Sequence, residues 1–299
     1  MMLLLSLMLA ASGAQDMKAA SVPPEVLVAY VSGPRSGEGL AELEAFFQEQ
    51  YPGYAIQTAQ VAGEAGQGVH AVTFIQAGEG RVSIEGGEPI DLRVGDLVLQ
   101  RPGKPHEFHG SMETVTFLLP ADQVLDAAIP DVVRPDFDPK LSDRPGGCAT
   151  DPGAYRRLLL TWNPDRGPYV HRGFNCHRVR IDDSFSHFHP VDGGFDEFYL
   201  VQEAPKGAVL LVSRRTSDLL SDSVREDELE QVMQRIPLEA GQLIMIPRGV
   251  THRGMGGAVV QVLAVPGFKP GQEIAMDEAI RRVNGRFALT GQRALPSHE

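Results

Sequence analysis

The sequence has few basic residues, few cysteines and no apolar run long enough to cross a bilayer. Lysine and arginine number 27 against 39 aspartates and glutamates, which gives a formal charge of −12. Phosphate binding needs a basic surface, so this balance argues against a duplex nucleic acid partner, although a local arginine cluster can still bind a small anion. The two cysteines, Cys148 and Cys176, are expected to be idle thiols, and whether they pair stays open.

The longest apolar run lies at the start of the chain. Met1–Ala11 is followed by small residues ending at Ala14, a pattern typical of a secretory signal peptide, but no basic residue precedes Lys18. The run is too short for a membrane-spanning helix, so no membrane partner is expected for the mature form. We expect residues 1–20 to be a signal peptide and flexible start that exports the protein to the periplasm or beyond. Translation from Met17 would instead leave the protein in the cytoplasm.

Glycine and proline are abundant, at 32 and 22 residues, which favours short strands joined by tight turns. A short strand near residues 26–33 and an amphipathic helix near 39–50 come first. Residues 54–119 and 155–265 then form two series of short apolar or alternating runs. The sequence therefore predicts a mainly β protein with two β-barrels and a few short helices.

The two series are separated by a segment that is rich in proline and aspartate. We divide the chain into an N-terminal domain (21–120), a linker (121–152) and a C-terminal domain (153–299). Apolar periodicity and capping residues predict further short helices near 121–128, 217–235 and 273–283.

Four side chains of metal-ligating type stand out in the second half. His187 and His189 are one residue apart and so point to the same side of a strand. Glu197 and His252 complete a set of three imidazoles and one carboxylate. These donors suit Fe(II), Mn(II), Zn(II), Ni(II) or Cu(II) better than magnesium or calcium. The set can bind one divalent metal and leave positions open for a substrate, as a catalytic site requires.

The second half resembles the cupin superfamily of RmlC-like β-barrels. The second cupin motif, G-x5-P-x-G-x2-H-x3-N, is matched at every position but the last by Gly241, Pro247, Gly249 and His252, while Gly256 replaces the asparagine. The first motif, G-x5-H-x-H-x3,4-E-x6-G, is matched by the two histidines and Glu197. Seven residues rather than three or four precede this glutamate, and both flanking glycines are missing. Asp196 is therefore a competing carboxylate.

The first half carries a degraded version of the same motifs. Gly95, Gly103 and His106 match the second motif, but Arg101 replaces its proline, and only His70 remains of the first motif. A site formed by His70, His106 and His109 is an alternative, but we expect no metal in this half. The resemblance spans roughly residues 54–268. It implies a bicupin of two jelly-roll (double-stranded β-helix) barrels, with the metal motif retained in the C-terminal barrel.

Several side chains near the metal set are candidates for other roles. Tyr199 lies two residues after Glu197 and should share its face, where it is either an acid–base group or a core residue. Glu197 itself is a candidate base as well as a ligand. Guanidinium groups can clamp a substrate carboxylate, and the candidates are Arg178, Arg180 and Arg248. Alternation in FNCHRVRI (174–181) leaves open whether the odd-numbered or the even-numbered residues face inward.

The resemblance implies a mononuclear metal enzyme that acts on a small oxygenated or carboxylated molecule. A dioxygenase-type oxidoreductase with Fe(II) is favoured. Two alternatives stay open: a non-redox isomerase, lyase or hydrolase that uses the metal as a Lewis acid, and a small-ligand-binding protein without turnover. Cupin barrels often dimerise, so a homodimer is a further expectation.

Overall fold

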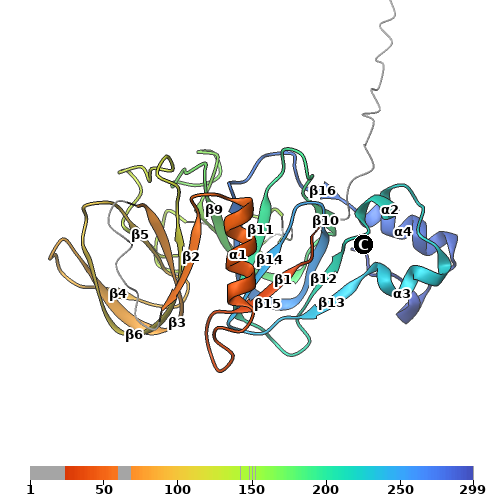
Figure 1. The fold of residues 1–299 in the computed structure, drawn as a ribbon, viewed down its shortest axis with the longest axis horizontal. Helices are drawn as coiled ribbons and strands as arrows, with labels where there is room; N and C mark the ends of the chain where they lie inside the picture. Colours follow the sequence, from red (N-terminus) through yellow and green to blue (C-terminus); the bar gives the residue numbers. More distant parts are fainter. Residues whose placement is uncertain are drawn as a thin grey trace, which may run out of the picture.

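The computed structural model describes residues 24–59, 69–141, 143–147, 149, 151 and 153–298. The expected signal peptide and Cys148 lie outside these residues, so they stay predictions. The described chain is mainly β, with antiparallel sheets and a few short helices, as predicted (Figure 1). None of its helices is both long and apolar enough to span a membrane.

The N-terminal sheet has six antiparallel strands. Two long strands, β3 (Ala71–Ile84) and β6 (His106–Leu118), pair along their whole length, apart from an irregularity between Ile75 and Ala77. Each is a single strand where the sequence suggested separate short runs. The other members of this sheet are β2 (Ala55–Ala59), β4 (Ile90–Leu92), β5 (Leu97–Gln100) and β7 (Val132–Val133).

The C-terminal sheet has ten strands and is organised around β15 (Thr251–Val265), which pairs with β9, β10, β11 and β12. These partners are β9 (Asn175–Asp183), β10 (His187–Phe188), β11 (Asp196–Glu203) and β12 (Val209–Ser213). The remaining strands are β1 (Leu27–Tyr30), β8 (Arg156–Leu160), β13 (Gln234–Pro237), β14 (Gln242–Ile246) and β16 (Ile274–Ala275).

Strand β1 precedes the N-terminal sheet in the chain but belongs to the C-terminal one, where it pairs with β14. The helix α1 (Leu40–Gln50) confirms the predicted helix, and it lies at the junction of the two sheets (Figure 1). Its apolar positions Leu43 and Phe47 are fully buried there. Gly39 starts the helix at φ +70, where a Cβ would lie 2.3 Å from the carbonyl oxygen of Val28. Only glycine fits this close approach.

The two sheets pack against each other through a shared aromatic core. Phe117 of β6 lies 5.7 Å from Phe198 of β11, and Phe47 lies 5.2 Å from the same ring, both in edge-on geometry. The contact is reciprocal, because Gln76 of β3 donates to the carbonyl oxygen of Val201 and Gln202 of β11 donates to that of Ile75. These glutamines end the similar strand segments AVTFIQ (71–76) and EFYLVQ (197–202). The two segments therefore contact each other through glutamines at the same position of each segment.

The other face of the C-terminal sheet, here called its inner face, encloses a second core. Side chains at alternate positions of four strands pack together on it, among them Val179, Tyr199, Ile244 and Val262. Because strand residues alternate between faces, this assigns the odd-numbered residues of β9 to the inner face. The alternative left open by the sequence is thereby resolved.

Short helices follow the strands rather than forming layers. The single helix expected near 217–235 is instead split into α2 (Thr216–Leu220), a 3-10 turn η1 (Glu226–Glu228) and α3 (Leu229–Val232). At the start of η1 the Glu228 carboxylate accepts a hydrogen bond from the backbone N–H of Arg225 at 3.3 Å. The helix expected near 273–283 is α4 (Asp277–Arg286), and η2 (Gly291–Arg293) follows it. The prediction of a helix near 121–128 was wrong. There the Asp126 carboxylate accepts the backbone N–H of Ala128, which favours a turn over a helix.

Candidate metal centre

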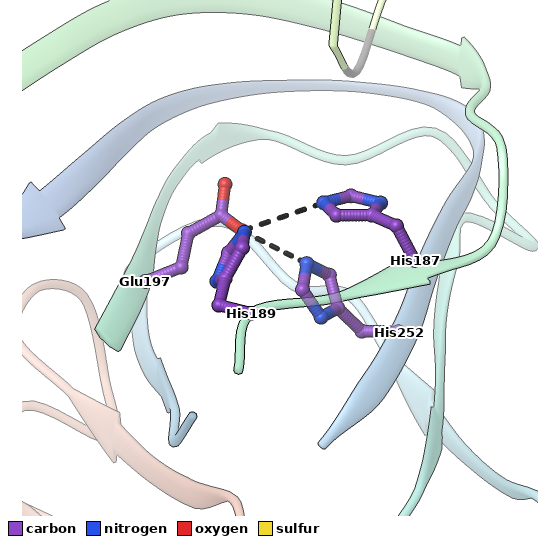
Figure 2. A group of neighbouring side chains, drawn as sticks. All are labelled: His187, His189, Glu197 and His252. Carbon is purple, nitrogen blue, oxygen red and sulfur yellow. Dashed lines mark hydrogen bonds and ion pairs between the residues drawn. The ribbon is translucent and has the colours of Figure 1, made fainter. Parts of the chain in front are cut away.

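Three strands bring the four predicted ligands together on the inner face. His187 of β10 and His252 of β15 are directly opposite each other in an antiparallel pair. His189 follows β10, and Glu197 is the second residue of β11, where it pairs with Ala264 of β15. Figure 2 shows the three imidazole rings turned toward the Glu197 carboxylate. All four side chains are buried, and their candidate ligand atoms lie within 4.8 Å of one another.

The distances fit a single metal ion. The Oε2 atom of Glu197 lies 2.8 Å from Nε2 of His252, 3.6 Å from Nε2 of His189 and 4.0 Å from Nε2 of His187. Ligand atoms held at roughly 2.1 Å from one ion are about 3.0 to 3.4 Å apart at octahedral or tetrahedral angles. The measured separations bracket this range, so small side-chain movements would close the set around an ion.

Backbone carbonyl groups fix the orientation of the imidazoles. Nδ1 of His187 lies 3.2 Å from the carbonyl oxygen of Phe185, and Nδ1 of His252 lies 3.1 Å from that of Val250. With the proton of each ring on Nδ1, these oxygens accept a hydrogen bond and the Nε2 lone pairs are available to a metal, which would replace the 2.8 Å contact between Nε2 of His252 and Glu197. Nε2 of His187 is buried and has no hydrogen-bond partner among the described residues. A buried polar atom without a partner is unfavourable, and a bound cation would satisfy it.

Burial also sets the protonation of the four groups. It lowers the pKa of His187 and His252 to about 4, and it lowers the pKa of His189 well below its ordinary value. Burial raises the pKa of Glu197 to about 7, although His187 and Arg156 oppose this shift. The imidazoles are therefore neutral at physiological pH, which is the form that binds metals.

Glu197 also lines a small cavity of about 30 Å³, room for roughly two water molecules. One wall is aromatic: Trp162 stacks on Phe268 at 3.9 Å, and Phe195 lies 5.1 Å from Phe268. The polar residues that line this cavity besides Glu197 are Arg156, Asn175, His177 and Glu273. A cavity of this size, with a metal ligand at one end and a mixed apolar and polar wall, has room for water or for one polar group of a larger molecule.

The competing carboxylate Asp196 is not part of the metal group. It neighbours Glu197 on β11 and so points to the opposite face. Its Oδ1 accepts hydrogen bonds from the backbone N–H of Arg248 at 2.8 Å and from the Arg248 guanidinium at 3.0 Å. Asp196 thus anchors the turn that leads to His252, and Arg248 is turned toward this anchor rather than toward the metal group.

The other two predicted substrate-binding arginines also lie away from the metal group. Arg178 and Arg180 occupy the even-numbered face of β9, opposite the inner face. Arg178 donates to Gln202 at 2.7 Å and forms an ion pair with Asp136. Arg180 forms an ion pair with Glu203 at 3.4 Å. The structure therefore brings none of these three arginines to the candidate centre.

Tyr199 shares the inner face with Glu197, as predicted. It is fully buried, and its ring lies 6.5 Å from the ring of His252 in edge-on geometry. The side chain belongs to the apolar core of the inner face, next to the His252 ring.

In the N-terminal sheet, His106 is held as His252 is, since its Nδ1 lies 2.7 Å from the carbonyl oxygen of Lys104. Ala71, however, occupies the position in β3 that Glu197 occupies in β11. His109 is exposed on β6. Within the part of the chain that the structure describes, His70, His106 and His109 are not among the metal-ligating side chains that converge.

Sequence analysis missed two charged residues of the cavity. Arg156 is two residues before Leu158, so alternation along β8 predicts that both side chains lie on one face of the strand. Only the pairing of β8 with β9 shows that this is the inner face. Glu273 was assigned to a helix start, and it carries no local signal. Glu273 lies at the cavity because it directly precedes β16, which pairs with β10.

Comparison by sequence finds no matching family model and no matching curated protein. Comparison by structure finds similar folds. One is salicylate 1,2-dioxygenase from Pseudaminobacter salicylatoxidans, with a TM-score of 0.50 and 13% identity over 85% of this chain and 88% of that chain. Its adduct with gentisate gives a TM-score of 0.50 and 14% identity over 83% of each chain. AerE from Microcystis aeruginosa gives a TM-score of 0.46 and 12% identity, over 71% of this chain and 88% of that chain. At such low identity the likeness concerns the fold alone, which is mainly β in this chain.

Proposed function

We propose that the protein is a metal-dependent enzyme that acts on a small oxygenated or carboxylated organic molecule, with dioxygenase-type oxidation at Fe(II) as the favoured reaction. The observation that carries this proposal is the convergence of three Nε2 atoms on the Glu197 carboxylate at one end of a cavity. A structural metal is enclosed by its ligands, whereas a catalytic one needs an open side.

In this proposal some residues hold the metal ion and others contact the substrate. His187, His189, Glu197 and His252 would hold the ion, which when bound supplies Lewis acidity and, if it is iron, the capacity to activate dioxygen. The aromatic wall excludes water and packs against the body of the substrate. Arg156 provides a positive charge at the cavity, which suits a carboxylate.

The structural neighbours support this choice of reaction, since one is named a salicylate 1,2-dioxygenase and is also known as an adduct with gentisate. Both named compounds are small carboxylated aromatic molecules, which would suit the aromatic wall and the guanidinium described above. The low identity leaves the substrate of this chain to experiment.

The test is metal analysis combined with oxygen uptake. Protein reconstituted anaerobically with Fe(II) is mixed with a panel of small hydroxylated and carboxylated compounds, and dissolved oxygen is followed with an electrode. Oxygen loss that depends on both iron and one compound supports the proposal. Tight zinc, manganese or nickel binding, with turnover but no oxygen loss, would refute the oxidative reaction.

A second candidate is a non-redox isomerase, lyase or hydrolase, and one observation favours it. Burial raises the pKa of Glu273 to about 7, and the nearby Glu197 adds to this shift. A carboxyl group with such a pKa beside a metal centre is suited to transferring protons at neutral pH. Exchange of substrate protons with solvent deuterium, without oxygen uptake, would select this candidate.

A further inference from the structure

We infer that His177 and Glu273 form a hydrogen-bonding subsite for a hydroxyl or carbonyl oxygen of the substrate, separate from the metal ligands. The inference rests on the proposed function in so far as it takes the cavity to be the substrate pocket. It adds a chemical class: flat molecules that carry a neutral oxygen function in addition to the groups that reach the metal.

His177 lies on the inner face of β9, in the same cross-strand row as Tyr199. Both pair with Val262 of β15, from opposite sides, and Leu158 of β8 lies beyond His177. The His177 side chain lines the cavity with Glu197. Its Nε2 atom is buried and has no hydrogen-bond partner among the described residues. A buried polar atom without a partner is unfavourable, so the atom favours a polar ligand in the cavity.

Glu273 reaches the cavity from a distant part of the chain. It directly precedes β16, where Ile274 pairs with Phe188 and Ala275 pairs with His187. Its carboxyl group lines the cavity together with Glu197, and the positive charge of Arg156 lies nearby. Gly147 makes room for it, because a Cβ at this position would lie 3.2 Å from Oε1 of Glu273.

The chemistry of the two groups selects a neutral partner. Burial and the nearby Arg156 lower the pKa of His177 well below its ordinary value, so the ring is neutral and offers one donor and one acceptor. The Glu273 carboxyl group accepts a hydrogen bond from a hydroxyl. The stacked pair Trp162 and Phe268 forms a flat apolar wall on the same cavity. A hydroxyl group of an aromatic or enolic molecule is small enough to enter this cavity, where it can hydrogen-bond to both polar groups beside the apolar wall.

A pocket that is built to hydrogen-bond a hydroxyl discriminates strongly against the analogue that lacks it, by up to about 10⁴-fold. The test uses Zn²⁺-loaded full-length protein and isothermal titration calorimetry with two matched pairs, gentisate against salicylate and salicylate against benzoate. We expect wild-type protein to prefer the hydroxylated member of at least one pair by about tenfold or more. His177→Phe and Glu273→Leu should each reduce this preference at least about fivefold and still bind one equivalent of zinc.

The controls are His109→Phe and Glu107→Leu, which change exposed residues of the N-terminal sheet and should leave the preference unchanged. His177→Gln retains a hydrogen-bonding group and should restore part of the preference, and it replaces the phenylalanine variant if that variant does not fold. The inference is overturned by an absence of preference in both pairs, by a preference that survives both variants, or by loss of zinc from the folded variants. Failure of the proposed function is a different result, namely a wild-type protein that binds no metal or turns over no substrate.

Discussion

Binding of Zn²⁺ to the metal-free protein should release close to one proton at pH 6 and almost none at pH 8. The proton comes from Glu197, because burial raises its pKa to about 7 and the ligand must be ionised to bind. The imidazoles contribute little, since burial keeps the pKa of His187 and His252 at about 4. In an ordinary site, protons compete with the metal for the histidines near pH 6 and not for the carboxylates. This site inverts that order.

The magnitude follows from these values. A carboxyl group with a pKa near 7 is about 90% protonated at pH 6 and about 10% at pH 8, so about 0.9 and 0.1 protons leave on metal binding. Zinc affinity should therefore rise about ninefold, or about 1.3 kcal/mol, from pH 5 to 6 and only about fivefold from pH 6 to 7, as the group approaches its pKa. Above pH 7 it should become nearly independent of pH until hydroxide competes for the ion.

The assay is calorimetric titration with zinc in buffers of different ionisation enthalpy, which counts the protons released. Glu273→Gln is the matched control, because Glu273 also has a raised pKa and the bound ion would shift it from a distance. Release of two or three protons at pH 6 would mean that the imidazoles are protonated. Release of none would mean that Glu197 is already ionised, and either result would refute the reasoning.

Three further predictions concern stability and ligand identity. Metal-free protein should lose a few kcal/mol of stability as the pH falls from 6.5 to 4, because His187, His252 and other buried imidazoles bind protons in the unfolded chain at a higher pH than in the folded one. This effect outweighs the opposite contribution of Glu197. Urea unfolding at each pH measures the loss, and a stability that does not change with pH contradicts it. Glu197→Gln should abolish stoichiometric zinc binding, whereas Asp196→Asn should still bind one equivalent. The second variant should lose roughly 1.5–3 kcal/mol of stability, because the Asp196 carboxylate accepts charged hydrogen bonds from Arg248. Retention of zinc by Glu197→Gln and loss of zinc by Asp196→Asn would reverse the assignment. Phe198→Ala should lower the free energy of unfolding by about 3–5 kcal/mol, since the ring is fully buried between the two sheets; a loss below about 1 kcal/mol would show that this core does not hold the sheets together.

Local patterns were enough to predict which four residues converge in the candidate metal centre. The pair His187 and His189 share a face because strand residues alternate, and the turn that contains Pro247 and Gly249 fixes where His252 enters β15. Glu197 needed only its position at the start of an apolar strand. Each of these signals spans only a few residues, so each can be recognised in the sequence without knowing which strands pair.

Other features depend on pairing between distant segments, and the sequence does not encode them locally. Strand β1 looks like part of the N-terminal sheet, but its partner is β14, more than 200 residues away. Arg178 and Arg180 were predicted to bind a substrate and Arg156 was not, because only the pairing of β9 with β8 and β15 decides which face is inward. Glu273 enters the cavity solely because β16 returns to β10.

The most direct test of the metal centre is the metal stoichiometry of two proteins after reconstitution with Fe(II) or Zn²⁺ and removal of free ions. Wild-type protein should hold one equivalent, and the double variant His187→Ala, His252→Ala should hold none while it remains folded by circular dichroism. One equivalent retained by the folded double variant, or none bound by the wild-type protein, would contradict the assignment of the centre to these four residues.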